Sequence, residues 1–413
     1  MARKAFIMVE GHNGFGLLFV QAALRLGLHP ITLSADPTSY DYLAAGGIEA
    51  IRVDTDDLGA LIHKCSELRT TYDIAGIIGF SGSDESACLT AAKLCRYFDL
   101  PGPDPVSIER CCDKFTQRQL LAGAGVPIPA FRSATNAMEV ESSAAEIGLP
   151  VILKPAVGSG SCGVRLCSNV DEVAEHTTYL LGGKHIWRSP PRILVEEFAQ
   201  GAFHCAHVTA NEVIGIGAAE LGPLPHFSFR QFTFPAPLSD DEYKRIAEVS
   251  LSCLQALDLG WGPTNVDLLW TKRGPVVIEV NPRLAGAPDP QLIQLAYGID
   301  LITEHIKLVI GENWDLRRRR SHTAAVRYLN PDHDGILDWI DGDSQASAIS
   351  GVVEAKLYVK PKTLIVRKGN YQDMIGHVIA SSPNLARTEA TLQRAIGSIT
   401  WSITPLPASG EHK

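Results

Sequence analysis

Residues 265–283 read NVDLLWTKRGPVVIEVNPR, and this stretch decides the fold. Two apolar-rich runs joined by a polar turn that ends in glycine predict a β-hairpin. A three-residue loop from Lys272 to Gly274, with Gly274 in the left-handed conformation, places residue 271 opposite 275. Counting outward then sets Asp267 directly opposite Glu279. Opposed side chains have Cβ atoms about 4.5–5.5 Å apart, where like charges are destabilising. The pairing therefore indicates a functional site.

Strand periodicity puts Asn281 on the same face as Glu279. Two carboxylates and an amide oxygen suit Mg²⁺, with Mn²⁺ as an alternative. Arg283 supplies a cation suited to phosphate. The alternative is a surface hairpin with solvated acids, but the apolar neighbours place Asp267 on a largely buried sheet, where unpaired charges are costly. The hairpin predicts metal-assisted chemistry on a nucleotide.

The composition is that of a globular enzyme. The 413 residues suffice for two or three domains, and 20% are charged while 45% are hydrophobic. A net charge of −9 argues against a nucleic-acid partner. The nine cysteines include no C-x-x-C pair, so neither disulfides nor a zinc site is indicated and a reducing cytoplasm fits best. No run reaches the ~18 apolar residues of a membrane span, so no membrane partner is expected.

Residues 1–105 alternate strand and helix, which predicts a doubly wound parallel sheet. The turn at 10–16 after the first strand is not G-x-G-x-x-G, so it is a weak dinucleotide site. Asp84 and Glu85 follow the fourth strand at the same carboxyl edge, where they could hold a substrate group. The predicted strands are Lys4–Glu10, His29–Leu33, Ala50–Val53 and Ile74–Gly79, and the helices are Gly16–Leu26, Leu58–Arg69 and Ser86–Phe98.

A proline-rich linker at 101–105 marks the first boundary, and residues 106–312 form the middle part. The last part, 313–413, contains β-rich segments and closes with a helical stretch. These are Thr323–Leu329, Gly351–Tyr358, Leu364–Arg367 and the helix Ser382–Ile396.

The middle part holds a glycine-rich loop, AVGSGSCGVR at 156–165, directly after a buried strand that ends in Lys154. Its backbone N–H groups can fold over phosphates, although the loop is not a Walker A motif. An ordinary flexible hairpin is the alternative. Lys114 opens a helix over 114–122, where its charge opposes the helix dipole, so it is plausible as a phosphate ligand. A further strand, 193–201, ends in a turn whose backbone could pair with an adenine edge beside Phe198.

Taken in order, these motifs resemble the ATP-grasp superfamily of carboxylate–amine ligases. The resemblance covers about 200 residues and implies an α/β ATP-grasp fold. This fold has a doubly wound preATP-grasp domain (1–105), a split α+β ATP-binding domain (106–312, lid subdomain about 125–200) and a small C-terminal α+β domain (313–413). The matching motifs are DKF at 113–115, VP at 126–127, GLPVILKP at 148–155, GSGSCGV at 158–164, VEEF at 195–198, Asp267 and EVNPR at 279–283.

The resemblance also implies roles for single residues. Lys114 and Lys154 are the ATP-phosphate lysines, and Lys154 and Arg283 are the catalytic cations. Asp267, Glu279 and Asn281 are the Mg²⁺ ligands. The lid contains Gly158, Ser159, Gly160, Ser161 and Gly163, and the adenine hinge contains Glu196, Glu197, Phe198 and Ala199.

The hinge departs from many relatives, which place an acid for the ribose in the sequence that follows. Here that sequence is QGAFH at 200–204, so His204 is the candidate, with a packed strand histidine as the alternative.

Within the superfamily the chain is most similar to the L-amino-acid ligases, on the segments 222–237 and 283–287. That similarity implies ATP-dependent joining of two amino acids through an acyl phosphate, by a homodimer. The candidate substrate residues are Asp84, Glu85, His226, Arg230, Arg283 and Gly286. The rivals are a purine-pathway or carboxylase-like ligase and a non-catalytic nucleotide-binding regulator. No A-M-K-M biotinyl motif is present, and retention of the site residues argues against the regulator.

Overall fold

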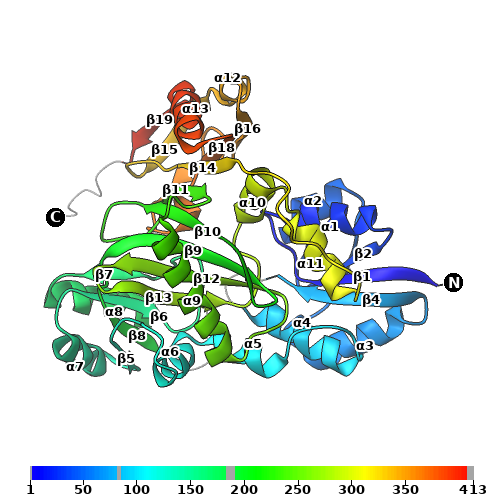
Figure 1. Ribbon diagram of the computed structural model, residues 1–413. Helices are drawn as coiled ribbons and strands as arrows, with labels where there is room; N and C mark the ends of the chain where they lie inside the picture. Colours follow the sequence, from blue (N-terminus) through cyan, green and yellow to red (C-terminus); the bar gives the residue numbers. More distant parts are fainter. Residues whose placement is uncertain (1, 81–84, 183–190, 407–413) are drawn as a thin grey trace, which may run out of the picture.

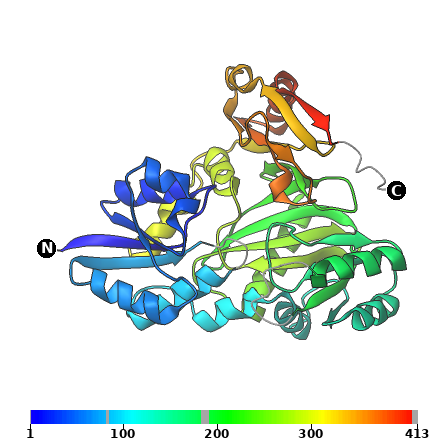
Figure 2. The same cartoon turned by 180° about the vertical axis from the view of Figure 1, so that it is seen from behind.

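The computed structural model describes residues 2–80, 85–182 and 191–406 (Figures 1 and 2). The N-terminal sheet is parallel with strand order β3-β2-β1-β4. Phe6, Ile7 and Met8 are fully buried, because helices cover both faces of such a sheet. The predicted strands and helices of this region are confirmed, with ends within two residues of the predicted bounds. They are β1 (Arg3–Val9), α1 (Gly16–Arg25), β2 (His29–Ser34), β3 (Glu49–Arg52), α3 (Leu58–Leu68), β4 (Tyr72–Gly79) and α4 (Ser86–Tyr97), with η1 (Pro37–Ser39) and α2 (Asp41–Ala45) added.

A small antiparallel sheet with strand order β5-β8-β6-β7 carries the glycine-rich loop between β6 and β7. Two helices on this sheet bury Val140 and Leu180 in its core. Two more helices lead into it from the N-terminal domain. The elements are α5 (Pro105–Cys112), α6 (Lys114–Gly123), β5 (Phe131–Ala134), α7 (Ala137–Ile147), β6 (Val151–Pro155), β7 (Arg165–Cys167), α8 (Val170–Gly182) and β8 (Ile193–Glu197).

The largest sheet has eight strands in the order β13-β12-β9-β10-β11-β14-β18-β16. It begins in the middle part of the chain and continues without a break into strands that follow residue 312, so the C-terminal part shares a sheet with the middle part (Figure 1). Helix α9 lies against its first strands. The elements are β9 (Gly201–Thr209), β10 (Glu212–Leu221), β11 (Phe229–Phe234), α9 (Asp240–Leu257), β12 (Pro263–Thr271), β13 (Gly274–Asn281), β14 (Thr323–Leu329), β16 (Val352–Leu357) and β18 (Gly376–Ser382).

The C-terminal part differs from its prediction in two places. The closing helix α13 (Leu385–Ser398) starts after residue 382, because Ser382 ends β18 and the Asn384 side chain caps the helix. A second small sheet with order β17-β15-β19 contains two strands that the sequence pattern did not predict. Its elements and their neighbours are β15 (Gly335–Asp341), α12 (Asp343–Ser347), β17 (Leu364–Ile365), η2 (Tyr371–Asp373) and β19 (Thr400–Pro405).

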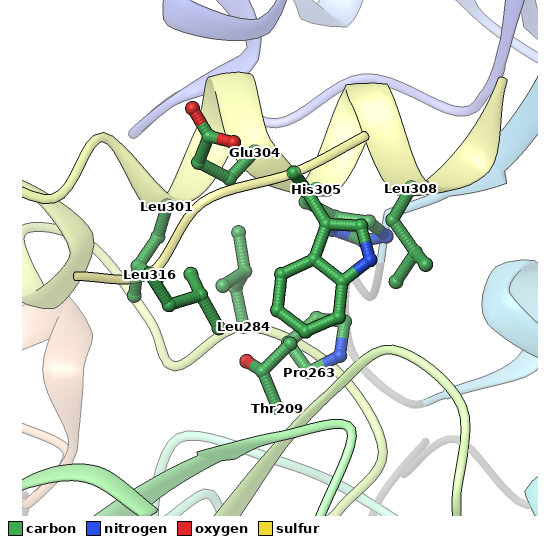
Figure 3. Close-up of a pocket in the computed structure, with 9 residues that line it drawn as sticks. Thr209, Pro263, Leu284, Leu301, Glu304, His305, Leu308 and Leu316 are labelled. Atoms are coloured by element: carbon green, nitrogen blue, oxygen red, sulfur yellow. The ribbon is translucent and has the colours of Figure 1, made fainter. Parts of the chain in front are cut away.

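Helices α10 (Asp289–Tyr297) and α11 (Leu301–Val309) join the N-terminal domain to the large sheet (Figures 1 and 2). One apolar core extends from Phe19 of α1 through Ile306 of α11 to Phe232 of β11. The end of this core beside α11 contains a small, mostly apolar cavity (Figure 3). The one carboxylate at the cavity, Glu304, is already bonded to Lys307 and to the Asp315 amide, at 2.8 and 2.7 Å.

The predicted hairpin is present, but its turn is one residue shorter than predicted. Thr271 pairs with Gly274, so Lys272 and Arg273 form a two-residue turn, and Gly274 has a φ of +99°. The predicted pairing of residue 271 with 275 is therefore wrong. A β-bulge at Ile278 inserts one extra residue, which restores the predicted opposition of Asp267 and Glu279.

The outer edge of β13 is covered by helix α6 and the segment after it. The Gln117 side-chain amide donates to the Val280 carbonyl at 2.8 Å and accepts from the Val280 N–H at 2.9 Å, in place of a neighbouring strand. Arg118 donates to the carbonyl of the bulge residue Ile278, and the Pro127 carbonyl accepts from Val277 at 2.8 Å. The strand that carries Glu279 therefore has few free backbone groups and is held rigidly.

None of the described helices is both long and apolar enough to cross a bilayer.

We expect Gln117→Ala to lower the free energy of unfolding by about 2 kcal/mol, because it leaves a buried N–H and a buried carbonyl of Val280 without partners. Urea unfolding of the parent and variant measures the difference. Gln119→Ala, on the exposed side of the same helix, is the control and should change stability by less than about 0.5 kcal/mol. Equal effects of the two variants would contradict the proposed edge contact.

Candidate active site

The centre of the site is the pair of opposed carboxylates, Asp267 on β12 and Glu279 on β13. Burial, together with the negative charge of Glu279, raises the pKa of Asp267 to about 7. Burial would also raise the pKa of Glu279, but Lys114, Lys154 and Arg283 outweigh it and hold that pKa below its usual value. The two acids therefore share one site, and three cations act on it.

Two asparagines complete this face of the hairpin. Asn281 lies opposite Asn265, on the face that carries both acids. The Asn265 amide nitrogen donates to Asp267 Oδ1 at 3.0 Å, while its carbonyl oxygen accepts from the Cys205 thiol. Asn265 was missed by the sequence reasoning, although its position two residues before Asp267 places it on the same face. It orients the carboxylate of Asp267.

Lys114 reaches the site from the first turn of α6. Asp113 caps this helix by accepting from the Thr116 N–H at 2.8 Å, which offsets the unfavourable position of the lysine charge. The Lys114 ammonium lies 2.8 Å from Glu279 Oε1 and also donates to the Gly158 carbonyl. It therefore links the carboxylates to the glycine-rich loop.

Lys154 belongs to a buried row of three charges. Its ammonium lies 2.5 Å from one oxygen of Glu196, and the other oxygen accepts from Arg118 Nε at 2.6 Å. Burial lowers the pKa of Lys154 to about 8, against the opposing effect of Glu196. Arg118 was also missed by the sequence reasoning. Its spacing of four residues from Lys114 puts both on one helix face, which is the signal that could have identified it.

The glycine-rich loop contains tight turns and touches the C-terminal part of the chain. Gly160 and Ser161 have φ values of +64° and +61°. A Cβ on Gly160 would lie 2.5 Å from the ring of Tyr371, so only glycine fits beneath that ring. The Ser161 hydroxyl donates to the Phe227 carbonyl at 3.2 Å, and the Gly163 carbonyl contacts His176 at 2.9 Å. Gly158 and Ser159 lie at the start of this loop, next to Lys114.

The predicted hinge lies at the end of β8, which contains Glu196 and Glu197, and Phe198 and Ala199 follow the strand. The Glu196 carboxylate is engaged by the two cations above, and the Glu196 backbone pairs with β5 on one side and β6 on the other. The Glu197 side chain accepts from the Ala130 N–H at 3.1 Å and from Arg273 at 2.8 Å. Ala199 is buried and donates its N–H to the Glu197 carbonyl at 3.0 Å, while Phe198 is half-buried.

His204 does not reach the site, which corrects the prediction of a ribose contact. It lies opposite Leu268 on the face of β9 away from Asp267, and Asp267 pairs with Cys205 instead. Its ring contacts the Ala202 carbonyl at 3.1 Å and is within electrostatic reach of Glu242 on α9. Strand alternation explains the difference, because a shift of one residue changes the face.

Arg283 connects the face that carries the two carboxylates to the N-terminal domain. Its Nε donates to both oxygens of Glu85, at 3.0 and 3.2 Å, and its Nη1 donates to the Leu284 carbonyl at 3.0 Å. Glu85 therefore holds Arg283 in this structure, instead of standing free for an ammonium group as predicted. Asp84 lies outside the described residues.

The remaining predicted substrate residues are less closely associated with the carboxylates. His226 packs against Gly369 in the C-terminal part, and Arg230 is the exposed extra residue of a bulge in β11. Gly286 is exposed, and its carbonyl accepts from the Asp289 N–H at 3.0 Å. The structure therefore brings together Lys114, Lys154, Asp267, Glu279, Asn281 and Arg283, and it leaves His226 and Arg230 in the surrounding segments.

This donor set fits a hard divalent cation. Two carboxylates and an amide on one strand-paired face match the oxygen ligands that Mg²⁺ takes. A bound cation would offset both the burial and the repulsion from Glu279 that raise the pKa of Asp267. The surrounding lysines and arginine fit phosphate groups.

Comparison with known proteins agrees with this geometry. Residues 113–317 match the family described as the carbamoyl-phosphate synthase L chain, ATP binding domain, and residues 327–404 match the L-amino acid ligase C-terminal domain 2. The chain is 58% identical over 403 residues to a Sinorhizobium fredii protein described as uncharacterized protein y4rH, covering 98% of this chain and 84% of that protein.

More distant relatives have described activities. The chain is 26% identical to mouse carnosine synthase 1 over 74% of its own length, which spans only 40% of that enzyme. It is 20% identical to the L-arginine-specific L-amino acid ligase of Bacillus subtilis, over 69% of this chain and 70% of that one.

A solved L-amino acid ligase from Bacillus licheniformis superimposes with a TM-score of 0.82 at 18% identity, over 98% of this chain and 100% of that chain. At this identity the likeness establishes the fold. Together with the matched families and the arrangement of lysines, acids and arginine, it shows that the chain belongs to the ATP-grasp family of carboxylate–amine ligases.

Proposed function

We propose that this protein joins the carboxylate of one amino acid to the amine of another through an acyl phosphate, with release of ADP and phosphate. The observation that carries the proposal is the opposed Asp267–Glu279 pair with Lys114, Lys154 and Arg283 acting on it. The match of residues 327–404 to an L-amino acid ligase domain supports amino acids as substrates.

Lys114 and Lys154 are proposed to bind the phosphates of ATP, beneath a lid formed by residues 158–163. Each lysine is now paired with a carboxylate, Glu279 or Glu196, at 2.8 and 2.5 Å. Asp267, Glu279 and Asn281 would hold Mg²⁺, which when bound neutralises charge on the phosphoryl group being transferred. If Mg²⁺ were held by Glu279, Lys114 would be released from that carboxylate and could bind a phosphate instead.

Arg283 is proposed to stabilise the phosphoryl group as it moves to the substrate carboxylate. The contact from Glu85 to its Nε fixes the guanidinium plane and leaves Nη2 free of the hydrogen bonds described for the other two nitrogens. The glycine-rich loop would exclude water, because an acyl phosphate exposed to solvent hydrolyses. The chain would thus contribute charge stabilisation and shielding.

The amino-acid substrates are proposed to lie between Arg283, Gly286 and the segment that carries His226 and Arg230. We also propose a cytoplasmic location and a homodimeric state, the first supported by the absence of a disulfide bond among the described residues. A ligase of another carboxylate, purine-pathway or carboxylase-like, is the alternative. The L-amino acid ligase match at 327–404 favours amino acids over it.

The central experiment is an assay of phosphate release with ATP, Mg²⁺ and pairs of amino acids, followed by mass spectrometry of the products. We expect release to depend on amino acids and a product whose mass is the sum of two amino acids less one water. Release that requires a single non-amino-acid carboxylate would support the alternative ligase, and no release with any pair would refute the proposal.

Glu279→Gln should lower kcat by about a hundredfold or more, because it removes one charge from the metal site and from Lys114. The steady-state rate of phosphate release at saturating ATP measures this loss. Glu212→Gln, an exposed acid on β10, is the matched control and should retain the parent rate. A near-parental rate for Glu279→Gln would exclude it as a metal ligand.

Asp267→Asn should stabilise the metal-free protein, and more so at pH 8 than at pH 5. The folded-state pKa of about 7 lies above the unfolded value of about 4, so the destabilisation by Asp267 grows as pH rises from about 4 to about 7 and is constant above that. The amide removes this cost and keeps the hydrogen bond from Asn265. Urea unfolding in chelator should show a gain about 2 kcal/mol larger at pH 8.

Asp73→Asn, an exposed strand acid, provides the control and should show no such dependence on pH. If Asp267→Asn were destabilising at both pH values, the two carboxylates would not repel each other in the metal-free fold.

A further inference from the structure

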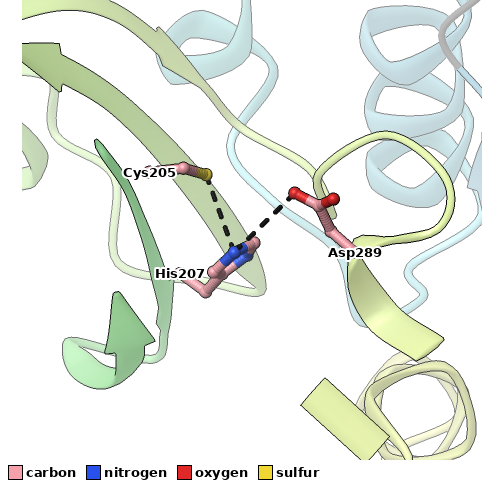
Figure 4. A group of neighbouring side chains, drawn as sticks. All are labelled: Cys205, His207 and Asp289. Atoms are coloured by element: carbon pink, nitrogen blue, oxygen red, sulfur yellow. Dashed lines mark hydrogen bonds and ion pairs between the residues drawn. The ribbon is translucent and has the colours of Figure 1, made fainter. Parts of the chain in front are cut away.

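A second cluster of ligand atoms lies beside the carboxylate pair and plays no part in the proposed ligation. Cys205 and His207 lie two residues apart on β9, so their side chains project from the same face of the strand. Asp289 is the first residue of α10 (Figure 4). One sulfur, one imidazole nitrogen and one carboxylate oxygen lie within 4.8 Å of one another. Three residue types that all bind transition metals therefore converge at one point.

The spacing is close to that of a tetrahedral metal site. The distance from Cys205 Sγ to His207 Nε2 is 3.6 Å, and His207 Nε2 lies 3.9 Å from Asp289 Oδ2. Tetrahedral Zn²⁺ with ordinary bond lengths sets S···N at about 3.6 Å and N···O at about 3.4 Å. The carboxylate is the ligand that has to move inward, because its oxygen lies 3.9 Å from His207 Nε2 and within 4.8 Å of Cys205 Sγ.

Two aromatic rings pack against the histidine of the cluster, and its acid is poorly compensated. Phe234 and Phe232 meet the His207 ring edge-on, at centroid distances of 5.6 and 6.4 Å. The Asp289 side chain is only 13% exposed, and among the described residues no hydrogen bond reaches its carboxylate. Burial and the nearby Asp267 charge raise its pKa well above the usual range. A bound cation would supply the missing compensation.

The protonation states favour a metal over an organic ammonium group. Burial lowers the pKa of His207 to about 3, so its nitrogen is a neutral ligand. A thiol and a neutral imidazole offer little to an ammonium ion, whereas Zn²⁺ binds thiolate, imidazole and carboxylate together. Mg²⁺ prefers oxygen ligands, so we expect it to bind at Asp267 and Glu279 and not at the cluster of Cys205, His207 and Asp289.

We propose that Cys205, His207 and Asp289 form a binding site for Zn²⁺ or a similar transition metal, with solvent or a small ligand in the fourth position. On binding, the Cys205 thiol and the Asp289 carboxyl group lose their protons to solvent, and the two resulting charges balance the metal. None of its three ligands has a role in the proposed ligation, and the site was not indicated by the sequence because its third ligand lies 82 residues after His207 along the chain.

The site is coupled to the carboxylate pair through one amide. The Cys205 thiol donates to Asn265, and Asn265 donates to Asp267 at 3.0 Å. A metal-bound thiolate has no proton to donate, so occupancy removes the first of these bonds. Metal binding at Cys205 therefore alters the orientation of the amide that holds Asp267.

The test uses the full chain, stripped with chelator and then titrated with Co²⁺ as a spectroscopic substitute for Zn²⁺. We expect one Co²⁺ per chain at this site, with the intense visible bands of tetrahedral cobalt and a thiolate-to-metal charge-transfer band. Cys205→Ser should abolish the charge-transfer band, and His207→Ala and Asp289→Asn should weaken binding by more than about tenfold. Cys253→Ala, which removes another buried thiol of the same domain, should leave the spectrum unchanged.

X-ray absorption of the Zn²⁺-loaded parent protein makes the test independent of variant folding. We expect one sulfur at about 2.3 Å and nitrogen or oxygen ligands at about 2.0 Å. A zinc shell without sulfur, the absence of a charge-transfer band in the parent, or a band that persists in folded Cys205→Ser would each overturn the proposal.

Discussion

The opposition of Asp267 and Glu279 is the constraint on which the other features of the site depend. Two buried carboxylates at one point of a sheet are unfavourable by themselves, and the pKa of about 7 for Asp267 expresses that cost. Lys114 from α6 stands 2.8 Å from one of them. Asn265 orients the other. Helix α6 also covers the edge of the strand that carries Glu279, so one helix supplies both the charge and the rigidity.

The surrounding charges are arranged as exchangeable pairs. Three ion pairs each join a cation to a carboxylate from another element: Lys114 with Glu279, Lys154 with Glu196, and Arg283 with Glu85. Buried ion pairs of this kind are costly to break by removing one partner, but a ligand that replaces the partner avoids the penalty. Each of these three cations is therefore compensated by a carboxylate of the chain itself.

The sequence predicted the N-terminal sheet and the main site residues because both depend on local patterns. Apolar runs define parallel strands, and glycines, lysines and acids occur in a recognisable order. It failed where tertiary context decides. The two-residue turn of the hairpin goes together with a bulge at Ile278. That bulge depends on contacts with other elements, namely the hydrogen bond from Arg118 and the pairing with β12. His204 faces α9 because of strand alternation, and the pairing of Glu85 with Arg283 unites residues 198 positions apart. The continuous eight-stranded sheet likewise crosses a boundary that composition places at residue 312.

The bulge at Ile278 has a consequence for how this hairpin can change. A two-residue turn with a bulge and a three-residue turn without one both bring Asp267 opposite Glu279, so the two features form a compensating pair. Changing either alone would turn one acid toward the apolar core of α9, because each single-residue shift exchanges the faces of a strand. A change of one residue in the length of the turn therefore requires a matching change of one residue in the strand. The length of the turn alone does not determine which face of the sheet the two acids occupy.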